Sequence, residues 1–418
     1  MNPTFRAGFG VHRLQPPLGA PMSGYAARMG GAVGVHDQLG AHAMILRWKT
    51  SSVAVISLDL EEVPDELVAM IREDIHAQIG VPLEAIVVAA THTHSGPLVA
   101  RRLGEDEDPA VVQDVRQAVL AAAALAETNT KEGVFRVGSV SVPQVAKDRR
   151  TLEPSPDSQA NFLGFYVQND MVGCVVNFPL HATVLGAENR LYSADFPGYL
   201  RRALQRKHPQ CCTLFLNGAA GDINIGYSAD ASALGERFDF RTFEKASEVG
   251  EALAQAVDVE LKKAPKLSEP IIRFGRHAVA LPLKNLVSLD ELDREISHHR
   301  QREQELTAIY LECLKDSMLR RGLCEGQSEV IMPLQAIRIG SAVLLAVPGE
   351  PFVQLGLAIR ESCRDRQVFV VGYANGAWGY IPSRSAFDQG GYEVETSIFA
   401  EGVGEALVRG AEMLIRSL

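Results

Sequence analysis

Residues 87–97 have the sequence VVAATHTHSGP, which combines a structural signal with a chemical one. The apolar run has β-strand character, and the Gly-Pro pair interrupts the regular backbone after it. Because side chains alternate faces along an extended segment, His92 and His94 are predicted to point to the same side. Neutral imidazole is a common metal ligand, so two of them at the mouth of a strand suggest a zinc site. Taken alone, the motif fits a pair of surface histidines equally well.

The composition is that of an ordinary globular protein. Of 418 residues, 46% are hydrophobic and 22% charged, and the formal net charge is −10. An acidic chain without a basic stripe is not expected to bind nucleic acid. No apolar run approaches the ~20 residues of a transmembrane segment. The N-terminus lacks the features of a secretion signal, so we expect a cytoplasmic protein. The six cysteines form no CxxC pair, which argues against a cysteine-based metal site.

Strand-like and helix-like segments alternate along most of the chain. Strands are expected at 52–60, 85–90, 161–167, 171–178, 212–216, 334–339, 342–346 and 367–372. Helices are expected at 65–79, 109–128, 197–208, 243–262, 351–363 and 400–418. The Asn169-Asp170 pair indicates a hairpin between two of the strands. We therefore predict one α/β domain over residues 1–418, with mixed β-sheets flanked by helices. Residues 289–320 are highly charged and read as a solvated helical excursion from it.

Metal-competent side chains follow several of the expected strands. His92 and His94 follow the first, His181 follows 171–178, Glu350 follows 342–346, and Tyr380 lies in the loop after 367–372. Ligands of open α/β folds bind beyond the C-terminal ends of the strands, so a metal site is predicted there. Two histidines, a carboxylate and an oxygen donor with one open position are typical of catalytic zinc, because a structural site would close the coordination.

Several motifs, in order, resemble the catalytic domain of the neutral/alkaline non-lysosomal ceramidases. They are THTHSGP (91–97), NFPLHAT (177–183), AAGD (219–222), and a last block from GYIP (379–382) to GYE (391–393). Three further matches are GYA (24–26), GVHD (34–37) and SLD (57–59). The resemblance therefore covers nearly the whole chain, and the two tyrosines twelve residues apart in the last block make it specific.

The resemblance implies a role for each motif residue. Zinc (Zn²⁺) would be held by His92, His181, Glu350 and Tyr380. The substrate would be faced by His94, Tyr392 and Arg149, with Arg150 as the adjacent alternative to Arg149. His94 could instead be a fifth ligand, and other divalent ions could compete with zinc at a site of nitrogen and oxygen donors.

The chain departs from the family pattern in three ways. A loop of the form SNAGDVSPN, whose serine has been proposed as a nucleophile, is NGAAGDIN at 217–224; Gly218 replaces the first serine of that loop. Catalysis is therefore expected to use metal and water instead of a covalent serine. The protein is also expected to lack the family's C-terminal β-domain and a secretion signal.

We therefore predict a zinc-dependent hydrolase that cleaves the amide bond of an N-acyl amine. The substrate would be ceramide-like, which would connect the protein to sphingolipid metabolism, or a smaller soluble amide. Two alternatives stay open. One is a catalytically inactive, metal-stabilised binding protein, and the other is a zinc ester or peptide hydrolase on the same fold. The oligomeric state is open as well.

Overall fold

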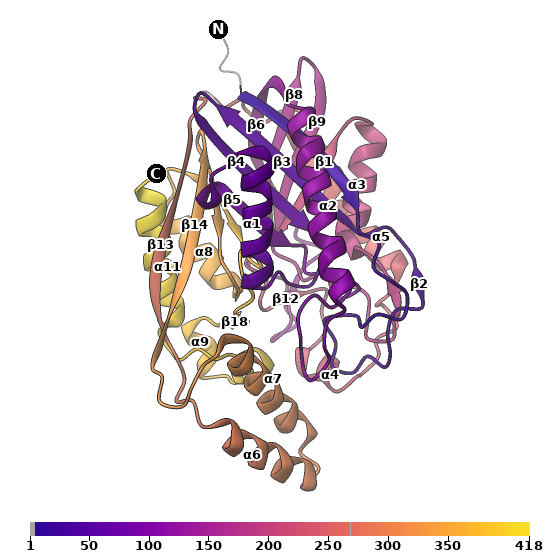
Figure 1. Ribbon diagram of the computed structural model, residues 1–418, viewed down its shortest axis with the longest axis vertical. Coiled ribbons are helices and arrows are strands. Elements are labelled where there is room, and N and C mark those ends of the chain that lie inside the picture. The colour runs from indigo at the N-terminus through magenta and orange to yellow at the C-terminus, as the bar shows by residue number, and fades with distance from the viewer. Residues whose placement is uncertain (1–4, 268) are drawn as a thin grey trace.

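A computed structural model describes residues 5–267 and 269–418, and two β-sheets form its frame (Figure 1). The larger is mixed and consists, in spatial order, of β11 (Cys212–Asn217), β9 (Asp170–Phe178), β8 (Gln159–Val167), β6 (Lys131–Ser141), β1 (Phe5–Arg13), β3 (Gly40–Trp48), β4 (Ser51–Leu58) and β5 (Ile86–Ala90). The smaller contains β13 (Ile272–Pro282), β14 (Glu329–Ile339), β15 (Ala342–Ala346) and β17 (Gln367–Val371). The predicted fold class, mixed sheets flanked by helices, is confirmed.

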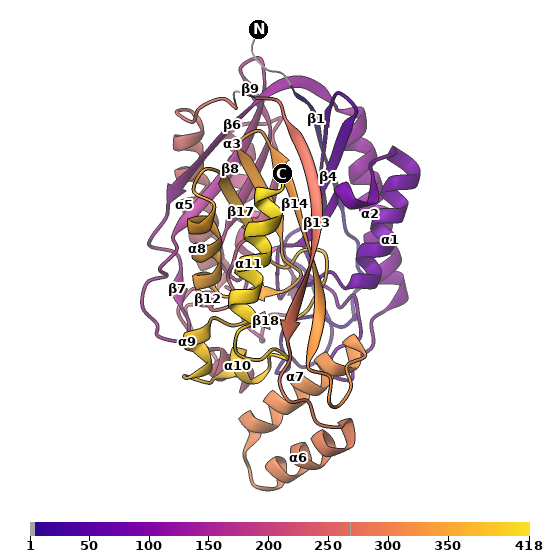
Figure 2. The same cartoon turned by 90° about the vertical axis from the view of Figure 1, so that its left-hand side faces the viewer.

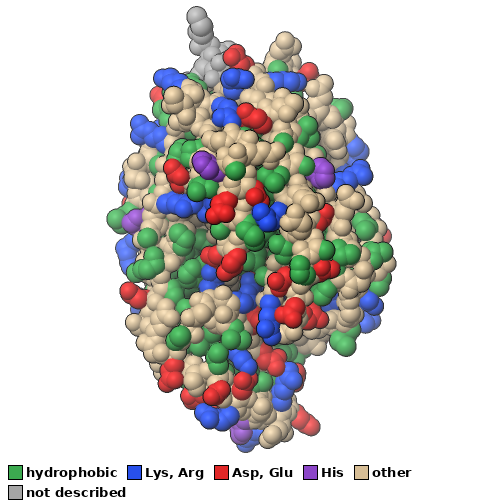
Figure 3. Space-filling view, in the orientation of Figure 1, with side chains coloured by type: hydrophobic (Ala, Val, Ile, Leu, Met, Phe, Trp, Pro, Cys, Tyr) green, Lys and Arg blue, Asp and Glu red, His purple; other side chains and the backbone are tan. Residues whose placement is uncertain are grey.

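Helices cover the outer faces of both sheets. Figure 1 shows α1 (Asp65–Ile79) and α2 (Pro109–Thr128) in front of the first strands, and Figure 2 shows α8 (Val353–Ser362) and α11 (Val403–Arg416) over the smaller sheet. A second pair, α3 (Asp195–Lys207) and α5 (Phe243–Leu261), packs on β11, β6 and β8. The described residues form two apolar clusters: one packs the larger sheet against its helices and against the smaller sheet, and the other packs the opposite face of the smaller sheet against α8 and α11. On the face in Figure 3, acidic and basic side chains are interspersed. No helix of the described chain is long and apolar enough to cross a bilayer.

Short elements complete the chain around the ends of the strands. They are β2 (Gly34–Val35), η1 (Leu83–Ala85), β7 (Lys147–Asp148), β10 (Leu191–Tyr192), β12 (Ile223–Asn224), α4 (Ala229–Ala233), β16 (Glu350–Pro351), β18 (Tyr380–Ile381), α9 (Arg384–Phe387) and α10 (Tyr392–Glu395). The parallel pair of β16 and β18 places Glu350 opposite Tyr380. Two predicted ligands are thereby neighbours.

Several predicted boundaries agree with the structure because local signals set them. The helix at 65–79 ends where Gly80 takes a left-handed φ of 76°. The helix at 109–128 begins after Asp108, whose side chain accepts a hydrogen bond from the Ala110 amide (2.8 Å). The predicted hairpin is present between β8 and β9.

Strand β1, at the centre of the larger sheet, was not predicted. Its sequence FRAGFGVHR breaks the apolar pattern with two glycines. A Cβ on Gly8 would lie only 1.9 Å from the carbonyl oxygen of Ala126 in α2, so glycine is required for this helix to pack on the strand. The glycine that interrupts the apolar pattern is therefore explained by the close packing of α2 on β1, which cannot be seen in the sequence. The pattern also missed β3, β6 and β13.

Residues 289–321 form two helices, α6 (Leu289–Gln301) and α7 (Glu305–Arg321). They are separated by residues 302–304, where Glu303 has a φ of 57°. Both figures show α6 projecting from the body, whereas α7 lies against it and buries Ala308, Ile309 and Met318. The inner side of this charged segment is thus part of the body of the protein.

A buried asparagine connects the sheets. The Asn177 side-chain amide donates to the carbonyl oxygens of Leu216 (3.0 Å) and Val370 (2.9 Å), which belong to strands of different sheets. The larger sheet is also strongly curved, because β11 contacts β4 and β5 although these strands are far away in the strand order. The C-terminal ends of β5, β9 and β15 consequently meet in one region.

We predict that Asn177→Ala lowers the free energy of unfolding by about 2–3 kcal/mol, because it leaves buried carbonyl groups without donors. Asn161→Ala is a matched control: Asn161 is the cross-strand partner of Asn177, equally buried, and its Nδ2 atom has no partner among the described residues. Urea denaturation of both variants checks this. Equal losses in the two would contradict the role of Asn177 as a connection between the sheets.

Candidate metal centre

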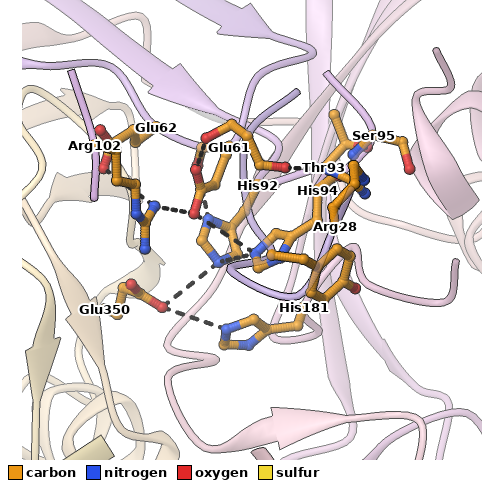
Figure 4. A network of polar contacts seen from close by, with 12 residues as sticks. Arg28, Glu61, Glu62, His92, Thr93, His94, Ser95, Arg102, His181 and Glu350 are labelled. Carbon is orange, nitrogen blue, oxygen red and sulfur yellow. Dashed lines mark hydrogen bonds and ion pairs between the residues drawn. The ribbon is translucent and has the colours of Figure 1, made fainter. Parts of the chain in front are cut away.

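Three strand ends bring two imidazoles and one carboxylate together. His92 lies two residues beyond β5, His181 three beyond β9, and Glu350 four beyond β15. Oε2 of Glu350 is 3.5 Å from Nε2 of His92 and 3.3 Å from Nε2 of His181 (Figure 4). The three ligand atoms lie within 4.8 Å of one another. The loops are held by Asn217, whose side-chain amide donates to the carbonyls of Thr91 (3.2 Å) and Leu180 (2.9 Å).

Backbone carbonyls determine which imidazole nitrogen carries the proton. Nδ1 of His92 is 2.7 Å from the carbonyl oxygen of Glu61, and Nδ1 of His181 is 2.6 Å from that of Ala220. A carbonyl only accepts, so each Nδ1 must donate its proton. Burial lowers the pKa of His92 to about 3 and that of His181 well below its usual 6.5, so both rings are neutral. Each Nε2 therefore presents a lone pair.

These lone pairs face the carboxylate of Glu350 without a donor between them. Among the described residues, Nε2 of His181 and Oε2 of Glu350 are buried and have no hydrogen-bond partner. Burial raises the pKa of Glu350, but a proton there would satisfy only one of the two imidazoles. A divalent cation satisfies all three atoms. The residues present therefore fit the metal that the motifs predict.

His92 reaches this position through a turn, in contrast to the extended geometry expected from the sequence. Strand β5 ends at Ala90, and His92 has a φ of 66°, a left-handed conformation that is rare for histidine. The expectation that strand alternation aligns His92 with His94 is wrong. The two rings nevertheless meet, with their Nε2 atoms 3.2 Å apart.

His94 lies beside the three candidate ligands but outside their group. Its Nε2 is 4.0 Å from Oε1 of Glu61, and its ring packs edge-on against Tyr25. A Cβ on Gly24, whose φ is 106°, would lie 2.3 Å from the His94 ring, so glycine is required there. His94 is therefore closely packed and lies beside a buried carboxylate.

Tyr380 and Tyr392 form one wall of the site. Tyr380 lies opposite Glu350 in the parallel strand pair, and its ring stands edge-to-face with that of Tyr392 at 6.0 Å. The Tyr392 hydroxyl is 3.9 Å from the thiol of Cys313 in α7. Both tyrosines line the two clefts that meet at the candidate metal position.

Of the two candidate arginines, Arg149 lines the site, and Arg150 pairs with the same carboxylate, Glu393, outside it. The Arg149 Nε donates to Oε1 of Glu393 at 2.6 Å, and its guanidinium lies 5.4 Å from the centre of the Tyr380 ring. Within the described chain, its buried Nη2 has no partner. Arg150 pairs with the second oxygen of Glu393 at 2.9 Å and with a backbone carbonyl at Gly390. Arg149 thus keeps one free donor near the predicted ligands.

Two clefts meet at the centre. One has an empty volume of about 760 Å³, including its open mouth, and extends toward α7 and Trp378. The other, of about 570 Å³, extends toward Tyr25 and Tyr227. They share the residues that surround the candidate metal position, namely His92, Arg102, Glu350, Tyr380 and Tyr392. A substrate can therefore extend to both sides of the reacting bond.

Sequence analysis missed three residues of this centre. Glu61 and Arg102 form a buried ion pair beside His94, and burial raises the pKa of Glu61 to about 7. Tyr373 is 3% exposed, and its ring lies on that of His92 with a centroid distance of 4.1 Å. Glu61 and Tyr373 each follow an expected strand directly, so the rule that identified Glu350 would have found them too.

Comparisons with known proteins agree with the motifs. No family model matches the chain. A curated neutral ceramidase from Pseudomonas aeruginosa is 22% identical over 456 aligned residues, which cover 90% of this chain. The chain spans 66% of the length of that relative.

Solved structures show the same fold. The crystal structure of neutral ceramidase from Pseudomonas aeruginosa superposes with a TM-score of 0.79 and 19% identity, covering 99% of this chain and 75% of the other. A ceramidase complexed with C2 gives a TM-score of 0.77 and 17% identity, covering 99% and 76%. The chain is thus a distant relative of the neutral ceramidases and has their fold, as its motifs predicted.

Proposed function

We propose that the protein is a metal-dependent hydrolase that cleaves the amide bond of an N-acyl amine. One observation carries the proposal: the Nε2 atoms of His92 and His181 and Oε2 of Glu350 converge in a buried place, and among the described residues neither Nε2 of His181 nor Oε2 of Glu350 has a hydrogen-bond partner. This centre lies where two clefts meet, so a ligand can reach it. The relationship to the neutral ceramidases supports an amide as the substrate class.

His92, His181, Glu350 and Tyr380 would hold the ion, which we propose is zinc. A set of nitrogen and oxygen donors is typical of catalytic zinc sites. When bound, zinc would act as a Lewis acid toward the amide carbonyl and lower the pKa of a reacting water. The carbonyls of Glu61 and Ala220 keep the two imidazoles in the ligand tautomer, which is the usual function of such outer partners.

Arg149 and Tyr392 would stabilise the negative charge that develops on the carbonyl oxygen. The Nη2 of Arg149 is a fixed donor, because Glu393 anchors the other side of the guanidinium. Donors that are already oriented and partly shielded from water contribute most to such stabilisation. Tyr392 lines both clefts and can reach a group bound between them.

His94 would deliver the proton that the leaving amine requires. An amine is a poor leaving group unless it is protonated, so a general acid must be close to the nitrogen. His94 is next to His92 and 4.0 Å from Glu61, the carboxylate whose pKa burial raises to about 7. Burial lowers the pKa of His94 well below 6.5, so its ring is neutral and would first take a proton from the attacking water before passing it to the amine.

The cleft toward α7 favours a short, polar acyl or amine group over a long hydrocarbon chain. Its walls include Arg320, which forms ion pairs with Glu62 and Asp316. Trp378, one of the aromatic residues that line this cleft, is covered by the guanidinium of Arg321 at 4.2 Å. A hydrocarbon chain there would take these ion pairs out of water without replacing their interactions.

Two other functions on this fold remain as alternatives. A metal-stabilised binding protein would have no use for the free donor of Arg149, so this donor argues for catalysis. An ester or peptide hydrolase would use the same centre and differ only in what the clefts accept. Assays with matched amide, ester and dipeptide substrates separate these possibilities.

We predict that His181→Ala and Glu350→Gln lose tightly bound zinc. Removal of a direct ligand should lower zinc affinity by more than the ~10–100-fold that loss of an outer partner costs. Zinc content after dialysis, measured by plasma mass spectrometry, checks this. His208→Ala is the control, because His208 pairs with Asp258 in another part of the protein. Zinc retained in His181→Ala would refute the ligand assignment.

We predict that kcat/KM does not rise steadily with acyl length when one amine carries acyl groups from acetyl to palmitoyl. In an apolar slot each methylene contributes ~0.8 kcal/mol, which is roughly a fourfold gain per carbon. In this cleft a longer chain would take the ion pairs of the wall out of water, which offsets the gain from each methylene. The short acyl groups should therefore be the better substrates. A continuous increase up to palmitoyl would show that a ceramide-like chain is accepted.

A further inference from the structure

Tyr373 is held at the centre by its backbone. Its amide donates to the carbonyl of Gly349 (2.8 Å), next to the ligand Glu350, and its carbonyl accepts from the amide of Ala90 (2.9 Å) at the end of β5. Its φ of 57° is unusual for a bulky residue, and such strain is concentrated at functional sites. The two strand ends that carry His92 and Glu350 thus both fix Tyr373.

The aromatic ring of Tyr373 has an evident structural role, but its hydroxyl does not. The ring lies against His92 at 4.1 Å with an interplanar angle of 30°, and stands edge-on to His181 at 5.9 Å. Phenylalanine would make the same contacts. The buried Oη atom has no hydrogen-bond partner in the described part of the chain. An unpartnered buried hydroxyl destabilises a protein, so its presence requires another reason.

A group bound in the cleft can supply the missing partner. Tyr373 lines the cleft toward α7 together with Glu350 and Tyr380, whereas Arg149 lines the other cleft. The two residues therefore approach the shared centre from different sides. A substrate carbonyl placed at that centre would find a guanidinium on one side and the phenol on the other.

We propose that Tyr373 is a catalytic residue whose hydroxyl donates a hydrogen bond to the amide carbonyl oxygen as negative charge develops on it. This role rests on the proposed amide hydrolysis and adds a donor that the family motifs do not include. No proton is transferred and no covalent bond to Tyr373 forms. The hydrogen bond strengthens as the carbonyl oxygen becomes negative, which is the condition for lowering the barrier.

The test is Tyr373→Phe, which removes one oxygen atom and keeps the ring on His92. We expect kcat to fall about 100-fold, at the lower end of the range for a lost oxyanion donor, while KM changes less than about twofold. Zinc content should be unchanged, and Tm should be equal or higher because an unsatisfied hydroxyl is gone. Tyr166→Phe, in β8 and half-buried, is the matched control and should leave all four quantities unchanged.

A second measurement does not depend on turnover. Methylphosphonate imitates a tetrahedral, negatively charged centre, and calorimetry should show that Tyr373→Phe binds it about 10–100-fold more weakly than the wild type. Loss of zinc would assign Tyr373 as a ligand, and a lower Tm would assign it a structural role. Unchanged kcat and unchanged phosphonate affinity would show that the hydroxyl has no role in catalysis or in binding of the charged centre. Each of these results overturns the proposal.

The same experiment separates this inference from the proposed function. If the wild type hydrolyses no amide, the proposed function fails, and the phosphonate comparison still decides whether Tyr373 is a donor at the centre. If the wild type is active and Tyr373→Phe is equally active, only the inference fails.

Discussion

The structure brings three buried acceptor atoms together, and we propose that a positive ion lies between them. Two neutral imidazoles turn their lone pairs toward one carboxylate oxygen, at 3.5 and 3.3 Å. The carbonyls of Glu61 and Ala220 prevent either ring from exchanging its proton to the other nitrogen. Packing does not explain this arrangement, because Nε2 of His181 and Oε2 of Glu350 have lost their water without gaining a partner among the described residues. This arrangement therefore supports the proposed cation.

The rest of the fold keeps these atoms in place. The larger sheet curves until β11 contacts β4 and β5, and Asn217 then joins the loops that carry His92 and His181. The smaller sheet supplies Glu350 and is tied to the larger one through Asn177. His92 and Tyr373 both adopt left-handed backbone conformations at the point where the sheets meet. The unusual backbone conformations, the buried polar atoms without partners and the two clefts thus lie at the same place, where the two sheets meet.

Part of this could be predicted from the sequence. Gly80 and Asp108 are local signals, so the helices they bound were predicted correctly. The rule that ligands gather at the C-terminal ends of strands located the candidate ligands, although the turn at His92 was missed because a left-handed φ leaves no pattern in sequence. Strand β1 was missed because its glycines are required by contacts with α2, a helix that is distant in the sequence. The free hydroxyl of Tyr373 became visible only when its surroundings were known.

The most direct test of the cation is anomalous X-ray diffraction at the zinc edge, from crystals of the protein grown with zinc. The account predicts one strong peak at about 2.0–2.2 Å from Nε2 of His92, Nε2 of His181 and an oxygen of Glu350. A map with zinc bound elsewhere and none between these three side chains would contradict it.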